Sequence, residues 1–218
     1  MTFLDSLFDL FFPVEVTSIF PVPFDYARAR HRIELRYRRT KRVPLIKAKT
    51  ADYDAMLPGI MIHDIGKLVD ERGFFAEIMR SDWKTVFGND TIVQANLSSS
   101  LPGTIRGWHR HSRGQVDYLI VLRGHVKICA YDDNEGSSTR GELSEIIASD
   151  QRSQIIRIPG HYWHGTKTLG FEPSLALYLV TRLYDAKNPD EERRPWNDLG
   201  IIDPTTSKPF DWNRPPHR

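Results

Sequence analysis

The chain has 218 residues, a formal net charge of +2, 40% hydrophobic residues and 27% charged residues. This length and composition can bury one substantial core, so we expect a single domain with appendages. The near-neutral charge predicts neither a nucleic-acid partner nor a membrane surface. The single cysteine, Cys129, excludes an intrachain disulfide and a CxxC metal or redox motif, and it favours a reducing, cytoplasmic setting.

Residues 1–56 form an aromatic and then basic extension, to which the sequence assigns no role. Leucine and phenylalanine recur at helical spacing near its start, which predicts a short amphipathic helix packed on the body or on a second subunit. Two aspartates and the absence of a basic flank argue against a signal peptide or a membrane anchor. In the basic run of residues 28–42, apolar residues alternate with charges, so we favour a solvated edge strand over a nucleic-acid site.

Residues 57–184 show the pattern of an all-β domain. Short apolar or alternating runs are separated by turn-rich pieces such as "DDNEGSSTRGE" and "GFEPS". The runs are "FFAEIM", "TIVQANL", "VDYLIVL", "HVKICAY", "SEIIAS", "SQIIRIP" and "SLALYLVTRLY". Because no helical periods intervene, we expect a sandwich or barrel rather than an α/β sheet. Residues 185–218 are rich in Pro, Asp, Asn and Trp, and we expect a loop-like tail packed on the barrel.

Histidines near strand ends are the main candidates for chemistry. In "GTIRGWHRH", His109 and His111 face one side of a strand while Trp108 and Arg110 face the other. The segment "QIIRIPGHYWHG" supplies a third candidate, His164, after a strand and a Pro-Gly turn. The other histidines of residues 57–184 are interpreted as structural; they are His63, His125 and His161.

Several segments carry a family resemblance. "GTIRGWHRH" with "RGHVKICAYDD", and "IPGHYWHG", resemble the two motifs of the cupin superfamily. The ordered series "DERGFFAE", "VQANLSSSLPGTIRGWH", "DDNEGSSTRGE", "IPGHYWHG" and "YLVTRLYD" resembles the dTDP-4-dehydrorhamnose 3,5-epimerase family. The resemblance implies a cupin-type double-stranded β-helix, or jelly roll, with a pocket inside the barrel. It also implies a homodimer with no required cofactor.

The family reaction assigns roles to matching positions. By resemblance, His109 is the base that removes the proton beside the ketone of a nucleotide-linked 4-keto-6-deoxy sugar. Tyr178 is the acid that returns a proton to the opposite face, and His164 belongs to the same site. The residue types suit these tasks, because an imidazole titrates near neutral pH and a phenol stays protonated there.

The resemblance also implies a set of substrate-binding residues. Guanidinium groups suit diphosphate oxygens, amides suit sugar hydroxyls or the base, and an aromatic ring suits stacking. The positions that match are Arg72, Phe75, Glu77, Gln94, Asn96 and Arg106.

Two departures from the family matter most for the chemistry. Asp117 stands where the family has a lysine that stabilises the enolate oxygen, and His111 stands where it usually has glutamine. An enolate beside an aspartate needs another positive group, such as Arg106, charged His164 or a metal. The family also orients its catalytic histidine with a C-terminal aspartate. Here that residue is left open among Asp198, Asp203 and Asp211, with Asp117 as a further candidate.

The same departures support an alternative. His109, His111, Asp117 and His164 match the ligand set of metal-binding cupins, although the step from His111 to Asp117 is slightly long. Three imidazoles and a carboxylate suit a divalent transition metal. The alternatives are therefore a metal-dependent isomerase or oxygenase acting on another small molecule, or a non-catalytic sugar-binding cupin.

Overall fold

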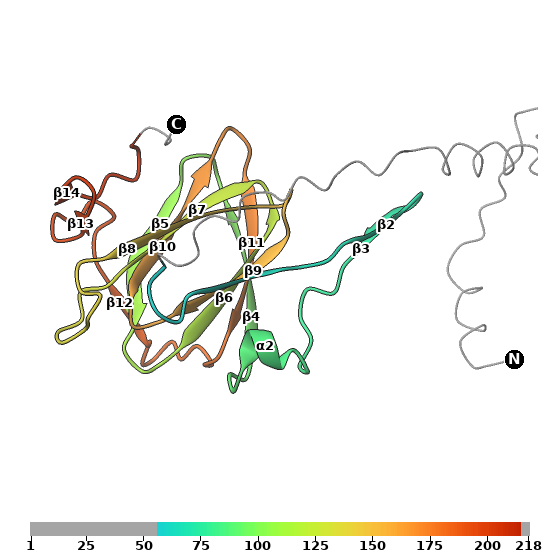
Figure 1. Cartoon of the computed structure of the whole chain (residues 1–218), viewed down its shortest axis with the longest axis horizontal. Helices are drawn as coiled ribbons and strands as arrows, with labels where there is room; N and C mark the ends of the chain where they lie inside the picture. Colours follow the sequence, from blue (N-terminus) through green and yellow to red (C-terminus); the bar gives the residue numbers. More distant parts are fainter. Residues whose placement is uncertain (1–55, 215–218) are drawn as a thin grey trace, which may run out of the picture. The chain divides into compact units, whose positions relative to one another are not determined.

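The computed structural model describes residues 56–214, so the helix and the edge strand predicted in the N-terminal extension lie outside the described residues. Two five-stranded antiparallel sheets face each other (Figure 1), in the orders β1-β9-β6-β11-β4 and β12-β5-β10-β7-β8. The first contains β1 (Met61–Asp64), β4 (Gln94–Ser100), β6 (Val116–Arg123), β9 (Gln154–Pro159) and β11 (Ser174–Val180). The second contains β5 (Ile105–His111), β7 (His125–Tyr131), β8 (Leu143–Ser149), β10 (Trp163–Leu169) and β12 (Glu191–Arg193). This arrangement confirms the predicted all-β fold.

Smaller elements lie outside the two sheets. They are the hairpin of β2 (Leu68–Asp70) and β3 (Gly73–Phe75), the short helix α2 (Lys84–Phe87), and the pair β13 (Ile202–Asp203) and β14 (Lys208–Pro209). No helix within residues 56–214 is long and apolar enough to cross a membrane.

Alternation along β6 explains how the core forms. Leu119 and Val121 belong to an apolar cluster that joins residues of both sheets. Tyr118 and Ile120 belong to a second cluster, which includes two residues of α2. Successive strand residues face opposite sides, so β6 is covered on both faces. Asp117, at the start of the same strand, is buried and brings a charge into the domain.

The C-terminal tail packs on the second sheet, as predicted, but it is not entirely loop. β12 pairs with β5, with Arg193 opposite His109, so the tail adds an edge strand. Further along, Trp212 packs on Trp108 with ring centroids 4.7 Å apart and the ring planes tilted by 43°. Gly165 makes room for this packing, because a Cβ there would lie 2.8 Å from Arg106 O and 3.3 Å from the Trp212 ring.

Several predicted strand bounds were shifted, and one strand was missed: β4 begins and ends three residues later than the run "TIVQANL", and β11 ends before the run "SLALYLVTRLY" does. The run "FFAEIM" is extended only to Phe75, the end of β3. Residues 163–169, which were not among the predicted runs, form β10 and pair with β5 and β7. Their sequence, "WHGTKTL", lacks an apolar alternation because Trp163 and His164 are both buried.

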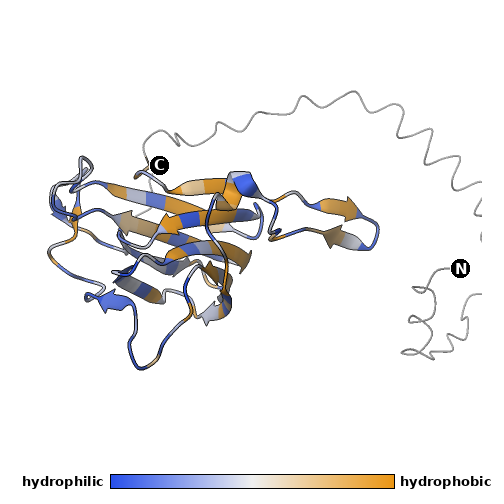
Figure 2. Cartoon of the chain, turned by 90° about the horizontal axis from the view of Figure 1, so that it is seen from below, coloured by the Kyte–Doolittle hydropathy of each residue, from blue (hydrophilic) through white to orange (hydrophobic). Residues whose placement is uncertain are grey.

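The β2–β3 hairpin extends beyond the sheets (Figure 1) and pairs with neither of them. It is rich in apolar residues (Figure 2), and two of them, Val69 and Phe75, are 76% and 64% exposed. An apolar hairpin of this kind is typical of an interaction surface.

Candidate active site

A pocket of about 700 Å³ lies where β4, β5, β6 and β11 meet the segment of residues 182–194. Of the predicted site residues, it is lined by Gln94, Asn96, Arg106, His109, His111, Asp117 and Tyr178. The structure therefore brings together residues that are far apart in the sequence and come from both sheets.

The three candidate histidines form one cluster. His109 and His111 lie on the same side of β5, as predicted, with ring centroids 5.7 Å apart. His164 sits opposite His109 in the β5–β10 register, and these rings approach to 4.2 Å between centroids. His164 is only 3% exposed, so it lies behind His109 rather than on the pocket wall.

Asp117 faces two of these rings. Its Oδ2 lies 3.4 Å from His164 Nε2 and 3.5 Å from His111 Nε2. Its Oδ1 accepts a hydrogen bond of 2.8 Å from the Gln115 amide. Burial raises the pKa of Asp117, but the contacts with His111 and His164 outweigh burial and hold that pKa well below its usual range.

The protonation states suit acid–base chemistry. Burial is the main cause that lowers the pKa of His109 well below 6.5, and neighbouring His164 adds to this effect. His109 is therefore neutral at pH 7 and can accept a proton. Burial raises the pKa of Tyr178 above 10.0, against a smaller opposing effect of a hydrogen bond with Thr166, so the phenol keeps its proton.

The predicted binding residues fall into two groups. Gln94 and Asn96 line the pocket, joined by a hydrogen bond of 2.7 Å, and Arg106 lines it from β5. Arg72, Phe75 and Glu77 lie on or just after the hairpin and do not line this pocket. In this chain, Arg72 pairs instead with Asp70 and Glu77 with Arg80.

The sequence analysis missed pocket residues that come from the segment after β11 and from the tail. Arg182, Tyr184, Arg193 and Arg194 line the pocket, and Gln94 Oε1 accepts a hydrogen bond from the Tyr184 backbone. Arg193 and Arg194 lie in a segment without periodicity, so no pattern marked them. Arg182 and Tyr184 lie at the end of the run "SLALYLVTRLY", which predicted a strand but no site residue there. The adjacent basic pair at 193–194 was the available signal.

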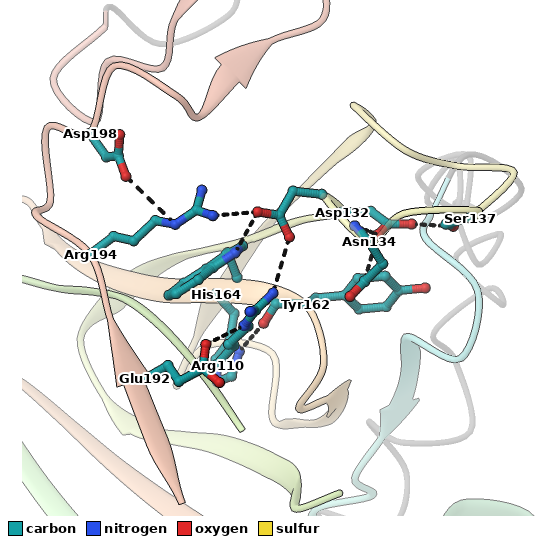
Figure 3. A network of polar contacts seen from close by, with 11 residues as sticks. Arg110, Asp132, Asn134, Ser137, Tyr162, His164, Glu192, Arg194 and Asp198 are labelled. Carbon is teal, nitrogen blue, oxygen red and sulfur yellow. Dashed lines mark hydrogen bonds and ion pairs between the residues drawn. The ribbon is translucent and has the colours of Figure 1, made fainter. Parts of the chain in front are cut away.

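A polar network holds part of the tail against the second sheet (Figure 3). Figure 3 labels two of its members, Arg110 and Arg194. Asp133 accepts hydrogen bonds from the guanidinium groups of both and from Trp163 Nε1. Both guanidinium groups also lie over the Trp163 ring, at 4.6 and 4.1 Å from its centroid. The network fixes Arg194, which lines the pocket directly after β12.

The C-terminal aspartates have other partners. Asp198 contacts Arg194, Asp203 pairs with Arg214, and Asp211 accepts a hydrogen bond from the Asn213 backbone. Within residues 56–214, none of them is hydrogen-bonded to His109. Among the carboxylates, Asp117 has the largest influence on His109.

Comparison with known proteins identifies the family. The family model of dTDP-4-dehydrorhamnose 3,5-epimerase matches residues 54–203. The chain belongs to this family. Membership confirms the resemblance, the cupin-type jelly roll and the assignment as an isomerase of the epimerase type. It does not favour the alternative of a metal-dependent cupin with another reaction, or that of a non-catalytic binding protein.

Individual relatives agree with this assignment. A probable low-salt glycan biosynthesis epimerase, Agl13, of Haloferax volcanii is 39% identical over 72% of the chain and 96% of its own length. The spore coat polysaccharide biosynthesis protein SpsL of Bacillus subtilis is 34% identical over 72% of the chain and 97% of its length. The dTDP-6-deoxy-D-glucose-3,5-epimerase of Legionella pneumophila, solved with dTDP-4-keto-L-rhamnose, is 30% identical. The two structures align with a TM-score of 0.59, and the aligned part covers 65% of this chain and 76% of the Legionella chain.

Proposed function

We propose that this epimerase acts on a nucleotide-linked 4-keto-6-deoxy sugar, with His109 as the base and Tyr178 as the acid. One observation carries the proposal: both side chains line one pocket from strands of opposite sheets, β5 and β11. A sugar ring held between the sheets presents one face to each group.

The chemistry follows from this placement. His109 takes the proton from a carbon beside the ketone, and the electron pair of the C–H bond moves to the carbonyl oxygen, which gives an enolate. Tyr178 then delivers a proton to the same carbon from the opposite face, and its configuration inverts. Proton loss and gain leave the oxidation state unchanged, so the reaction needs no redox cofactor. His164 packs behind His109 and supports the position of its ring.

The rest of the pocket suits the nucleotide part of the substrate. Arg106, Arg182 and the tail arginines Arg193 and Arg194 supply cations for a diphosphate. Gln94 and Asn96 offer amides for sugar hydroxyls or the base.

The hairpin supports a homodimer. Arg72, Phe75 and Glu77 do not line the pocket of their own chain, and the apolar hairpin residues beside them are exposed. We propose that the hairpin packs on a second copy and that these three residues complete its pocket. Buried, unpaired Cys129 fits the cytoplasmic setting expected from the sequence.

Deuterium wash-in tests the reaction. The protein is incubated in D₂O with dTDP-4-keto-L-rhamnose, and NMR follows the protons on the carbons that flank the ketone. We expect these protons to be replaced by deuterium. No exchange with this or any other nucleotide-linked 4-keto-6-deoxy sugar would overturn the proposal.

Subunit complementation tests the hairpin. An Arg72→Ala, Phe75→Ala variant and a Tyr178→Phe variant are each expected to be impaired. When the two are mixed in equal amounts and allowed to exchange subunits, about half of the dimers are hybrids, and each hybrid has one intact pocket, so the activity of the mixture should return toward about a quarter of the wild-type value. No gain on mixing, with hybrid dimers demonstrated, would show that the hairpin serves its own chain or none.

A further inference from the structure

Among residues 56–214, the carboxylate of Asp117 is buried without a lysine or arginine partner. Its side chain is 6% exposed, and its contacts are the Gln115 amide and the rings of His111 and His164. A buried carboxylate requires a compensating positive charge. Neutral imidazoles do not provide one, so either a proton or a bound cation must stand among these groups.

The hydrogen bonds of His164 favour a cation. Its Nδ1 lies 2.8 Å from the carbonyl oxygen of Tyr162, which can only accept a hydrogen bond, so Nδ1 carries the proton. In the neutral ring, the lone pair of Nε2 then faces Asp117 Oδ2 at 3.4 Å. Two acceptors are directed at each other, which is the arrangement of two ligands around a metal ion.

The distances agree with this interpretation. His111 Nε2 lies 3.5 Å from the same Oδ2, and the ligand atoms of the whole cluster, including His109, lie within 4.8 Å of one another. A four-coordinate ion with bonds of about 2.0–2.1 Å separates its ligand atoms by about 3.4 Å. The buried Nδ1 of His111 has no hydrogen-bond partner within residues 56–214, so that ring is not fixed by hydrogen bonds on both sides.

We propose that His111, Asp117 and His164 bind a divalent first-row transition metal. Two imidazole nitrogens and one carboxylate oxygen suit zinc, iron, manganese, cobalt or nickel better than magnesium or calcium, which prefer oxygen ligands. Gln115 Nε2 donates to the other carboxylate oxygen and so directs Oδ2 toward the ion; it also lies 3.1 Å from His111 Nε2, a contact that the ion would replace. His109 remains free to act as the base.

The site opens toward the substrate. His111, Asp117 and Gln115 all line the pocket, so a ligand from the pocket can complete the coordination. A Lewis acid beside His109 would stabilise negative charge that forms on a ketone oxygen. Only this role depends on the proposed function; the metal site itself stands on the geometry.

Metal binding is measured without any sugar. The full-length protein, purified without an affinity tag and stripped with a chelator, is titrated with cobalt(II) while the visible spectrum is recorded, and with zinc in a calorimeter. We expect one ion per chain and cobalt bands typical of nitrogen and oxygen ligands at low coordination number.

Variants locate the ion. Asp117→Asn and His164→Gln should each weaken binding by about 100-fold or more, and Gln115→Met by about 10–100-fold. His125→Gln is the matched control, because His125 is an exposed histidine at the start of β7 and outside the cluster. Circular dichroism checks that each variant is folded. If a ligand variant fails to fold, the metal affinity of Gln115→Met tests the site instead, because this change removes no charge and none of the proposed ligands.

The proposal is overturned by an absence of stoichiometric binding, or by binding that Asp117→Asn and Gln115→Met leave unchanged. In the latter case the ion is held elsewhere in the chain. Deuterium wash-in separates this result from the fate of the proposed function. Deuterium exchange without metal binding would overturn the metal site and leave the epimerase proposal intact. Metal binding without deuterium exchange would support the metal site and overturn the epimerase proposal.

Discussion

Gly160 is the position at which a single methyl group should test the packing behind the site. A Cβ on Gly160 would lie 2.1 Å from the carbonyl oxygen of Gln115 and 2.8 Å from the Cβ of His111. The Gly160 backbone also donates a hydrogen bond to Gln115 O and accepts one from His111 N. Gly160→Ala must therefore displace Gln115 and His111, two of the three residues that contact Asp117.

The magnitude can be worked out from these contacts. The nearest atom belongs to the backbone, which can move little to relieve the clash. We therefore expect overpacking to lower the free energy of unfolding by about 3 kcal/mol. Alanine also reduces the conformational entropy of the unfolded chain, which offsets about 0.4–1 kcal/mol of this cost. A net loss of about 2 kcal/mol corresponds to a Tm lowered by about 4–8 °C for a chain of this size.

Gly66→Ala is the matched control, because a Cβ at Gly66 meets no heavy atom within 4 Å. Its unfolding free energy should change by less than about 0.5 kcal/mol. Thermal unfolding followed by circular dichroism, together with the wash-in rate, measures both variants. If Gly160→Ala melts with the control and exchanges at the wild-type rate, the close packing derived for this site is wrong.

Three further predictions concern the tail, the core and the base. Asp133→Asn removes the carboxylate shared by Arg110 and Arg194, so the free energy of unfolding measured in urea should fall by about 1–3 kcal/mol. The control Asp185→Asn, at an exposed position, should change it very little. Burial raises the pKa of the Cys129 thiol well above 9.0, so a disulfide reagent should label it only after unfolding; rapid labelling of the native protein would contradict its burial. Because burial lowers the pKa of His109, the wash-in rate should fall only as the pH drops below 6.5, when the base becomes protonated; a decline that begins above pH 7 would argue against His109.

The sequence predicted those features that depend on the alternation of residues within one strand. Period-two alternation placed His109 and His111 on one side of β5, and the two rings do face the same cluster. The alternating run 125–131 was identified as a strand and is β7 without change.

Other features depend on contacts that no local pattern records. Arg193 reaches the pocket because β12 pairs with β5, a contact between segments about 80 residues apart in the chain. The separation of Arg72 from the pocket follows from the path of the hairpin, which the motif "DERGFFAE" does not encode. Strand β10 was missed because both of its leading residues are buried, on opposite faces of the sheet.

The division of labour between His109 and Tyr178 is tested most directly by wash-in with His109→Asn and Tyr178→Phe, compared with the wild type. His109→Asn should lose exchange by about 10²–10⁴-fold. Tyr178→Phe should still exchange the proton that His109 removes, but with retention of configuration, because no acid acts on the opposite face. Exchange at the wild-type rate in folded His109→Asn, or inversion by Tyr178→Phe at the wild-type rate, would contradict the assigned acid and base.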